Sequence, residues 1–105
     1  MAGEFVTVGR EDELPAGKGR QVTVDGRWVA LLNVNGTHYA IDAICLHRGG
    51  PLAEGKIEGD TIQCPWHGSQ FSIFDGHVVK GPSVHPQPCL EVRIQNGQVE
   101  VRRRG

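Results

Sequence analysis

The chain has 105 residues, of which 38% are hydrophobic and 22% are charged, so it can form one hydrophobic core and is neither collagen-like, coiled-coil nor mainly disordered. Its 11 Lys and Arg against 12 Asp and Glu give a formal net charge of -1. A nucleic-acid partner is therefore not expected, because basic residues cluster only at Arg102, Arg103 and Arg104.

Turn signals divide the chain into short segments that are rich in β-branched and aromatic residues. Asp25-Gly26, Asn35-Gly36 and Asn96-Gly97 are pairs that accept positive φ, so they predict three tight hairpins. No segment shows helical spacing of apolar residues, and 15 Gly with 6 Pro leave little room for a long helix. We expect an all-β fold, a small sandwich or partly open barrel. The predicted strands are 5–8, 21–24, 27–34, 37–41, 61–63, 71–73, 90–94 and 99–101, whereas 43–59 and 76–88 are expected to lack strands.

No apolar stretch approaches the roughly 20 residues that span a bilayer, and Met1-Ala2-Gly3-Glu4 lacks the start of a signal peptide. We therefore expect a cytoplasmic protein without a membrane partner. The three cysteines agree with this location, because two of them stand beside histidines rather than in a disulfide framework.

Two short motifs carry the chemistry: Cys45-Leu46-His47 and Cys64-Pro65-Trp66-His67. Each offers one thiolate and one imidazole, and this donor set leaves two alternatives open. One zinc ion could take all four ligands, although zinc sites usually pair Cys with Cys and His with His at longer spacings. Alternatively, both Cys could bind one iron and both His a second iron, the mixed ligation of Rieske [2Fe–2S] centres.

Residues 45–52 read CLHRGGPL and residues 64–71 read CPWHGSQF, and these paired motifs resemble the Rieske family. The resemblance is greatest to the small ferredoxins of bacterial aromatic-ring dioxygenase systems. It implies one domain over residues 1–105, a Rieske-type β-sandwich or partly open barrel. Two cluster-binding loops, about 43–59 and 64–71, would lie at the tip of that domain. It also implies one [2Fe–2S] cluster held by Cys45, His47, Cys64 and His67.

Several further residues are expected to surround the cluster. Gly49, Gly50 and Gly68 have no Cβ, which would let backbone amides approach the sulfurs closely. The resemblance implies a loop with Gly81 and Pro82 over the cluster. Arg48 could contact a partner carboxylate or point to water, and Trp66 could pack the loop or face a partner.

The resemblance also predicts a potential in the lower Rieske range. Gly50 and Trp66 stand where the quinol-oxidising branch has two additional cysteines, so a disulfide between the loops cannot form. Ser69 retains a hydroxyl that this branch directs at the cluster, whereas Phe71 replaces a tyrosine whose hydroxyl reaches a ligand sulfur. Losing a donor to sulfur destabilises the reduced state and lowers the potential.

The resulting hypothesis is a one-electron carrier between a flavoprotein reductase and a terminal oxygenase of an aromatic-ring dioxygenase system. No nucleotide fingerprint or substrate domain is evident, so the chain alone is not expected to be an enzyme. The alternative is a fixed small subunit, for instance of an assimilatory nitrite reductase. Outside the motifs, His38 is expected to be an ordinary, partly exposed strand residue, and Cys89 a small buried one. His77 and His85 could lie near the cluster.

Overall fold

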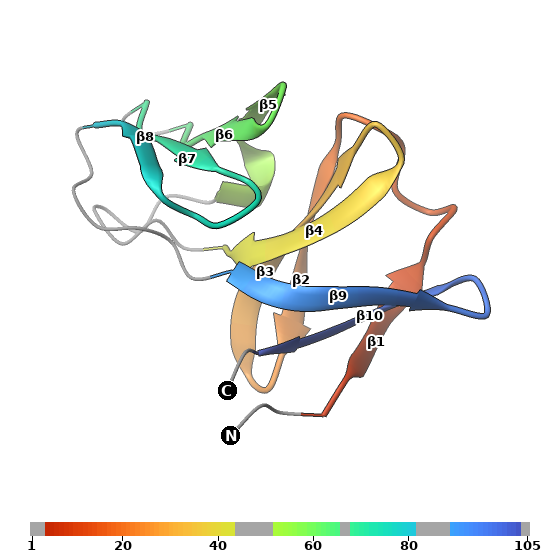
Figure 1. Cartoon of the computed structure of the whole chain (residues 1–105). Coiled ribbons are helices and arrows are strands. Elements are labelled where there is room, and N and C mark those ends of the chain that lie inside the picture. Colours follow the sequence, from red (N-terminus) through yellow and green to blue (C-terminus); the bar gives the residue numbers. More distant parts are fainter. Residues whose placement is uncertain (1–3, 44–51, 66–67, 82–88, 104–105) are drawn as a thin grey trace.

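A computed structural model of the chain describes residues 4–43, 52–65, 68–81 and 89–103 (Figure 1). It consists of ten strands and one short 3-10 helix within these ranges. None of its described helices is long and apolar enough to cross a membrane. In chain order the elements are β1 (Val6–Arg10), β2 (Gly19–Val24), β3 (Arg27–Val34), β4 (Thr37–Asp42), η1 (Leu52–Glu54), β5 (Lys56–Glu58), β6 (Thr61–Gln63), β7 (Gln70–Ser72), β8 (Val78–Lys80), β9 (Cys89–Gln95) and β10 (Gln98–Arg103).

The three predicted hairpins are confirmed. Asp25, Asn35 and Asn96 have φ values of 52, 54 and 54°, and the glycine after each also has positive φ. Positive φ at both central residues matches the right-handed twist of the flanking strands. Local turn chemistry therefore connects β2 to β3, β3 to β4 and β9 to β10.

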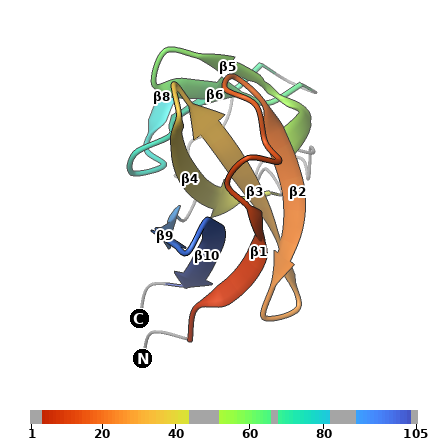
Figure 2. The same ribbon diagram turned by 90° about the vertical axis from the view of Figure 1, so that its right-hand side faces the viewer.

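Six strands form the larger sheet, in the order β1-β10-β9-β4-β3-β2, and neighbouring strands are antiparallel. The sheet curls so that β1 also approaches β2, which gives a nearly closed barrel (Figure 2). The predicted all-β, partly open barrel is thus observed.

Strands β3 and β4 form a wall with a core on each side. Val29 and Leu31 of β3 join one buried cluster inside the barrel, whereas Ala30 and Leu32 join a second cluster under the smaller sheet. Side chains alternate between faces along a strand, so both faces of β3 are buried. This explains its nearly continuous apolar sequence.

The smaller sheet, in the order β5-β6-β7-β8, covers the outside of this wall (Figure 1). Its core contacts come from residues such as Ile62, Phe71 and Ile73. At Gly55 the backbone after η1 passes very close to β6. A Cβ at this position would lie 2.1 Å from the backbone oxygen of Gln63. Only glycine permits this approach.

Two predictions about irregular segments are wrong. Strand β5 lies within 43–59 and β8 lies within 76–88, both expected to lack strands. Each has three residues, too few for a period to be recognised in the sequence, and each forms by pairing with a neighbour: Ile57 with Ile62, and Val78 with Phe71. Tertiary pairing therefore decides the structure of both segments.

The junction between the two sheets should carry much of the stability. Leu32 is fully buried there, so Leu32→Ala should lower the free energy of unfolding by about 2–5 kcal/mol in denaturant titrations. Ile94 is 43% exposed on β9, and Ile94→Ala should change this free energy by about 0.5 kcal/mol or less. Equal losses in the two variants would contradict this description of the core.

Candidate metal centre

The second predicted ligand loop connects β6 to β7 in a tight turn. The backbone N–H of Cys64 donates to the carbonyl of Ser69 at 2.8 Å, and the N–H of Gly68 donates to the carbonyl of Cys64 at 3.0 Å. Gly68 has a φ of 77°, a conformation that side chains with a Cβ rarely adopt. The turn therefore fixes the backbone of Cys64 and requires glycine at position 68.

The side chain of Cys64 is directed into the protein. Cys64 is 0% exposed, is not in a disulfide and belongs to the buried cluster beneath the smaller sheet. Ser69 is also fully buried, and Phe71 packs in the same cluster as Cys64. A thiol at this position is shielded from water on the protein side.

The first predicted loop starts and ends in that same cluster. Ala43 and Leu52 flank residues 44–51 and are both fully buried in it, together with Cys64. The N–H of Leu52 donates to the carbonyl of Ala43 at 2.7 Å, which joins the two ends of the loop. The N–H of Ala43 in turn donates to the carbonyl of Trp28 on β3 at 3.2 Å. The geometry thus brings the base of the first loop to the thiol of the second.

Most of the predicted site lies outside the described residues: Cys45, His47, Arg48, Gly49, Gly50, Trp66, His67 and Pro82. Of the rest, Cys64, Gly68 and Ser69 share the β6–β7 turn, and Gly81 is exposed just after β8. Within the described ranges no three His, Cys, Asp or Glu residues form a metal-binding group. The ligand set therefore stays a prediction.

A buried ion pair at the base of the first loop was missed from the sequence. Asp42, the last residue of β4, accepts a hydrogen bond of 3.1 Å from Arg103 Nη2 on β10, and its side chain is only 8% exposed. Arg27 Nη2 lies 3.9 Å from the same carboxylate. Asp42 and Arg103 are 61 positions apart in the sequence, so no local pattern indicates that they pair. It ties the last strand to the start of the loop.

The structure corrects the prediction for His38, which is 8% exposed rather than partly exposed. Burial lowers the pKa of His38, and the Glu11 carboxylate opposes this shift. Cys89 is half-buried and packs against the cluster that contains Cys64. His77 is exposed in the β7–β8 turn, where its N–H groups contact Asp75 and lower the pKa of that carboxylate. His85 lies outside the described residues.

The donor chemistry tests which metal group fits this site. The two motifs supply two thiolates and two imidazoles, and the described thiol is buried and free of a disulfide. Thiolates are soft ligands that suit iron–sulfur clusters, while neutral imidazoles suit iron. Cys64 stands at the start of the β6–β7 turn and is buried among apolar side chains, which fits a ligand of an iron–sulfur group shielded from water.

A small β-barrel with a covering sheet, together with two sequence motifs that each pair Cys with His, indicates an iron–sulfur protein. The sequence profile of the Rieske [2Fe-2S] domain matches residues 4–94. The chain belongs to the Rieske [2Fe-2S] domain family, and the predicted fold and [2Fe–2S] cofactor are confirmed. The zinc alternative is not supported.

Several known proteins are similar to most of the chain. The ferredoxin component of the naphthalene 1,2-dioxygenase system of Pseudomonas aeruginosa is 33% identical over 89 residues, which are 85% of this chain and 86% of the relative. The ferredoxin of carbazole 1,9a-dioxygenase from Nocardioides aromaticivorans is 26% identical with a TM-score of 0.91, covering 97% of this chain and 100% of that one. A chain from the complex of reduced oxygenase and oxidized ferredoxin in carbazole 1,9a-dioxygenase is 31% identical with a TM-score of 0.87, covering 92% and 91%.

The fold is also similar to a structure from Mycobacterium tuberculosis described as the small subunit of an NADH-dependent nitrite reductase. Its TM-score is 0.88 over 97% of this chain and 96% of that one, at 24% identity. At this identity the similarity establishes the shared fold alone.

The geometry of the β6–β7 turn gives a prediction for Gly68. Gly68→Ala should destabilise the turn by about 1–2 kcal/mol, because a Cβ penalises the left-handed conformation. Bleaching of the visible absorption during heating should therefore occur at a lower temperature. Gly68→Asn is the matched control, since Asn tolerates positive φ better than Ala does. Its bleaching temperature should fall less than that of Gly68→Ala. If both variants bleach like the unaltered protein, position 68 does not need its left-handed backbone.

Proposed function

We propose that Cys45, His47, Cys64 and His67 hold the [2Fe–2S] cluster, with both cysteines on one iron and both histidines on the other. The loops at about 43–59 and 64–71 would enclose it, as part of one domain over residues 1–105. The support is the position of Cys64: it shares one buried cluster with Ala43 and Leu52, the residues that flank the loop carrying Cys45 and His47. When bound, the cluster supplies one-electron redox chemistry.

We further propose that the chain passes single electrons from a flavoprotein reductase to the terminal oxygenase of an aromatic-ring dioxygenase system in the cytoplasm. Relatives that match most of its length are ferredoxin components of such systems, and one solved relative comes from a complex with an oxygenase. The protein's own contribution is to hold the cluster, shield it with Phe71 and neighbouring apolar residues, and present a docking surface. On this proposal the chain is a carrier and has no substrate of its own.

The residues around the cluster have proposed roles that follow the same logic. Ser69 is fully buried, and its carbonyl accepts the backbone N–H of Cys64, which supports its hydroxyl as a donor toward the cluster. Gly68 keeps the turn tight, and Gly49 and Gly50 would do the same in the first loop. Gly81 and Pro82 would begin the covering loop after β8. Trp66 would pack the second loop or face a partner, and Arg48 would contact a partner carboxylate or point to water.

Single cysteine variants test the ligand assignment. Cys45→Ser and Cys64→Ser should abolish the visible absorption of the cluster, because the thiolate carries the bond to iron. Cys89→Ser is the matched control: Cys89 stands at the start of β9, outside the two motifs, and its Sγ donates to the carbonyl of Ile73 at 3.9 Å, so this variant should retain a normal spectrum. A normal spectrum for either of the first two variants would remove that cysteine from the ligand set.

The missing hydroxyl at Phe71 predicts a low potential. In a redox titration followed by electron paramagnetic resonance, the midpoint should fall in the lower part of the Rieske range, which runs from about -150 to +300 mV. Ser69→Ala should lower the midpoint further, because it removes the remaining hydroxyl donor. A midpoint above about +150 mV, in the upper part of that range, would contradict the low-potential assignment.

Reconstitution tests the carrier role itself. A flavoprotein reductase and a terminal oxygenase of an aromatic-ring dioxygenase system, supplied with NADH, should hydroxylate their substrate only when the holoprotein is added. The rate should rise with its concentration, as expected for a diffusing carrier. Stoichiometric copurification with a sirohaem enzyme, without any support of oxygenase turnover, would instead favour the small-subunit alternative.

A further inference from the structure

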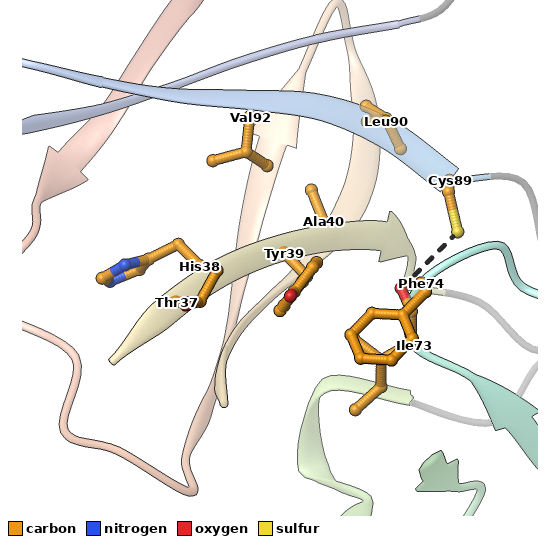
Figure 3. Close-up of a pocket in the computed structure, with 9 residues that line it drawn as sticks. All are labelled: Thr37, His38, Tyr39, Ala40, Ile73, Phe74, Cys89, Leu90 and Val92. Atoms are coloured by element: carbon orange, nitrogen blue, oxygen red, sulfur yellow. Dashed lines mark hydrogen bonds between the residues drawn. The ribbon is translucent and has the colours of Figure 1, made fainter. Parts of the chain in front are cut away.

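The carboxylate of Asp42 and the guanidinium of Arg103 meet at one end of the barrel interior. Ala40, two residues before Asp42, points toward β9 and lies in the cluster inside the barrel (Figure 3). Val101, two residues before Arg103, lies in the same cluster. Residues two apart on a strand share a face, so both charged side chains extend this inner face beyond its apolar part.

The two groups form a charge-assisted hydrogen bond that is largely shielded from water. Arg103 Nη2 donates to Asp42 Oδ1 at 3.1 Å, and the two side chains are only 22% and 8% exposed. Arg27 approaches the same carboxylate at 3.9 Å, but its side chain is 65% exposed. Salt screens exposed charges strongly and buried charges much less. The charges of Asp42 and Arg103 therefore act over a longer distance than those of the surface pairs.

The length of the chain limits how far this pair can be from the first motif. Asp42 directly precedes Ala43, which is fully buried and whose carbonyl accepts the N–H of Leu52 across the base of the loop. Cys45 follows Asp42 by three residues. A fully extended chain spans at most about 3.6 Å per residue, so the Cα atoms of Asp42 and Cys45 are no more than about 11 Å apart.

Two opposite charges at this distance should affect a reduced cluster in opposite ways. Reduction adds one electron to the cluster without forming or breaking a bond, and the charge around the cluster helps to set its potential. A carboxylate destabilises the added negative charge, whereas a guanidinium stabilises it. Across about 10 Å of partly buried protein, one unit charge changes the ratio of reduced to oxidised cluster by about two- to tenfold at a fixed potential.

We propose that the pair of Asp42 with Arg103 tunes the potential of the cluster: Asp42 disfavours the reduced state and Arg103 favours it. Neither residue is a ligand, and both act through space. This role rests on the proposed assignment of Cys45 as a ligand, which places the cluster beside the end of β4.

Redox titration of three purified holoprotein variants, followed by electron paramagnetic resonance, tests the proposal. At the potential where the unaltered cluster is half reduced, Asp42→Asn should raise the ratio of reduced to oxidised cluster by about two- to tenfold. Arg103→Gln should lower this ratio by a similar factor. Arg103→Lys retains the charge, so its ratio should stay within about twofold of the unaltered protein. Shifts of Asp42→Asn and Arg103→Gln in the same direction, as a loosened loop would give, or no shift in either, would overturn the proposal.

The pair of Arg93 with Glu100 provides the matched control on the same two strands. Their side chains are 2.5 Å apart and 50% and 16% exposed, and Glu100 stands three residues before Arg103, about 10 Å further from the loop along β10. Arg93→Gln and Glu100→Gln should each change the ratio by less than about twofold, because distance and solvent weaken these charges. Changes as large as those of the Asp42 and Arg103 variants would show a general charge effect, and the proposal would fail.

The visible absorption verifies that each variant holds its cluster. If Arg103→Gln loses the cluster, Asp42→Asn and Arg103→Lys still decide, since a raised ratio in the first with an unchanged ratio in the second supports the charge effect. An unchanged ratio in Asp42→Asn would overturn it. Failure of the ligand assignment is a separate result, because Cys45→Ser would then retain a normal spectrum.

Discussion

The structure depends on one apolar cluster that receives the bases of both ligand loops. Ala43 and Leu52 bury the two ends of the first loop, and Cys64 enters the same cluster from the second. Because these residues pack together, folding of the smaller sheet onto β3 and β4 also brings Ala43 and Leu52, which flank the first motif, into one cluster with Cys64 of the second. Metal binding and folding are therefore expected to stabilise each other.

The strands of the barrel are joined over very different lengths. Strand β3 pairs with β2 over residues 27–32 and with β4 over residues 29–34, and Asp42 and Arg103 join β4 to the last strand. The contact of β4 with β9 is much shorter, with only Ala40 and Ile41 of β4 paired to β9. The wall that supports the proposed cluster is thus held by longer strand pairing than the junction of β4 with β9.

The sequence was sufficient where structure is decided locally. The pairs Asp25-Gly26 and Asn35-Gly36 determine their hairpins through positive φ at two consecutive residues, which few other residues accept. The paired motifs indicated the cofactor because their donors and spacing are unusual. Strands β5 and β8 could not be predicted, since three residues carry no period and their pairing is tertiary. The ion pair of Asp42 with Arg103 depends on the register of strands across the barrel, which no local pattern contains. The burial of His38 depends on which face of β4 other elements cover.

The central claim is that two histidines and two cysteines divide between the irons of one cluster. Pulsed electron paramagnetic resonance of the reduced protein, grown with ¹⁵N-histidine, measures this most directly, because nitrogen bound to iron couples strongly to the unpaired electron. The account predicts couplings from two histidine nitrogens that change on ¹⁵N labelling. A reduced cluster without any histidine coupling would contradict it, since neither His47 nor His67 would then be bound to iron.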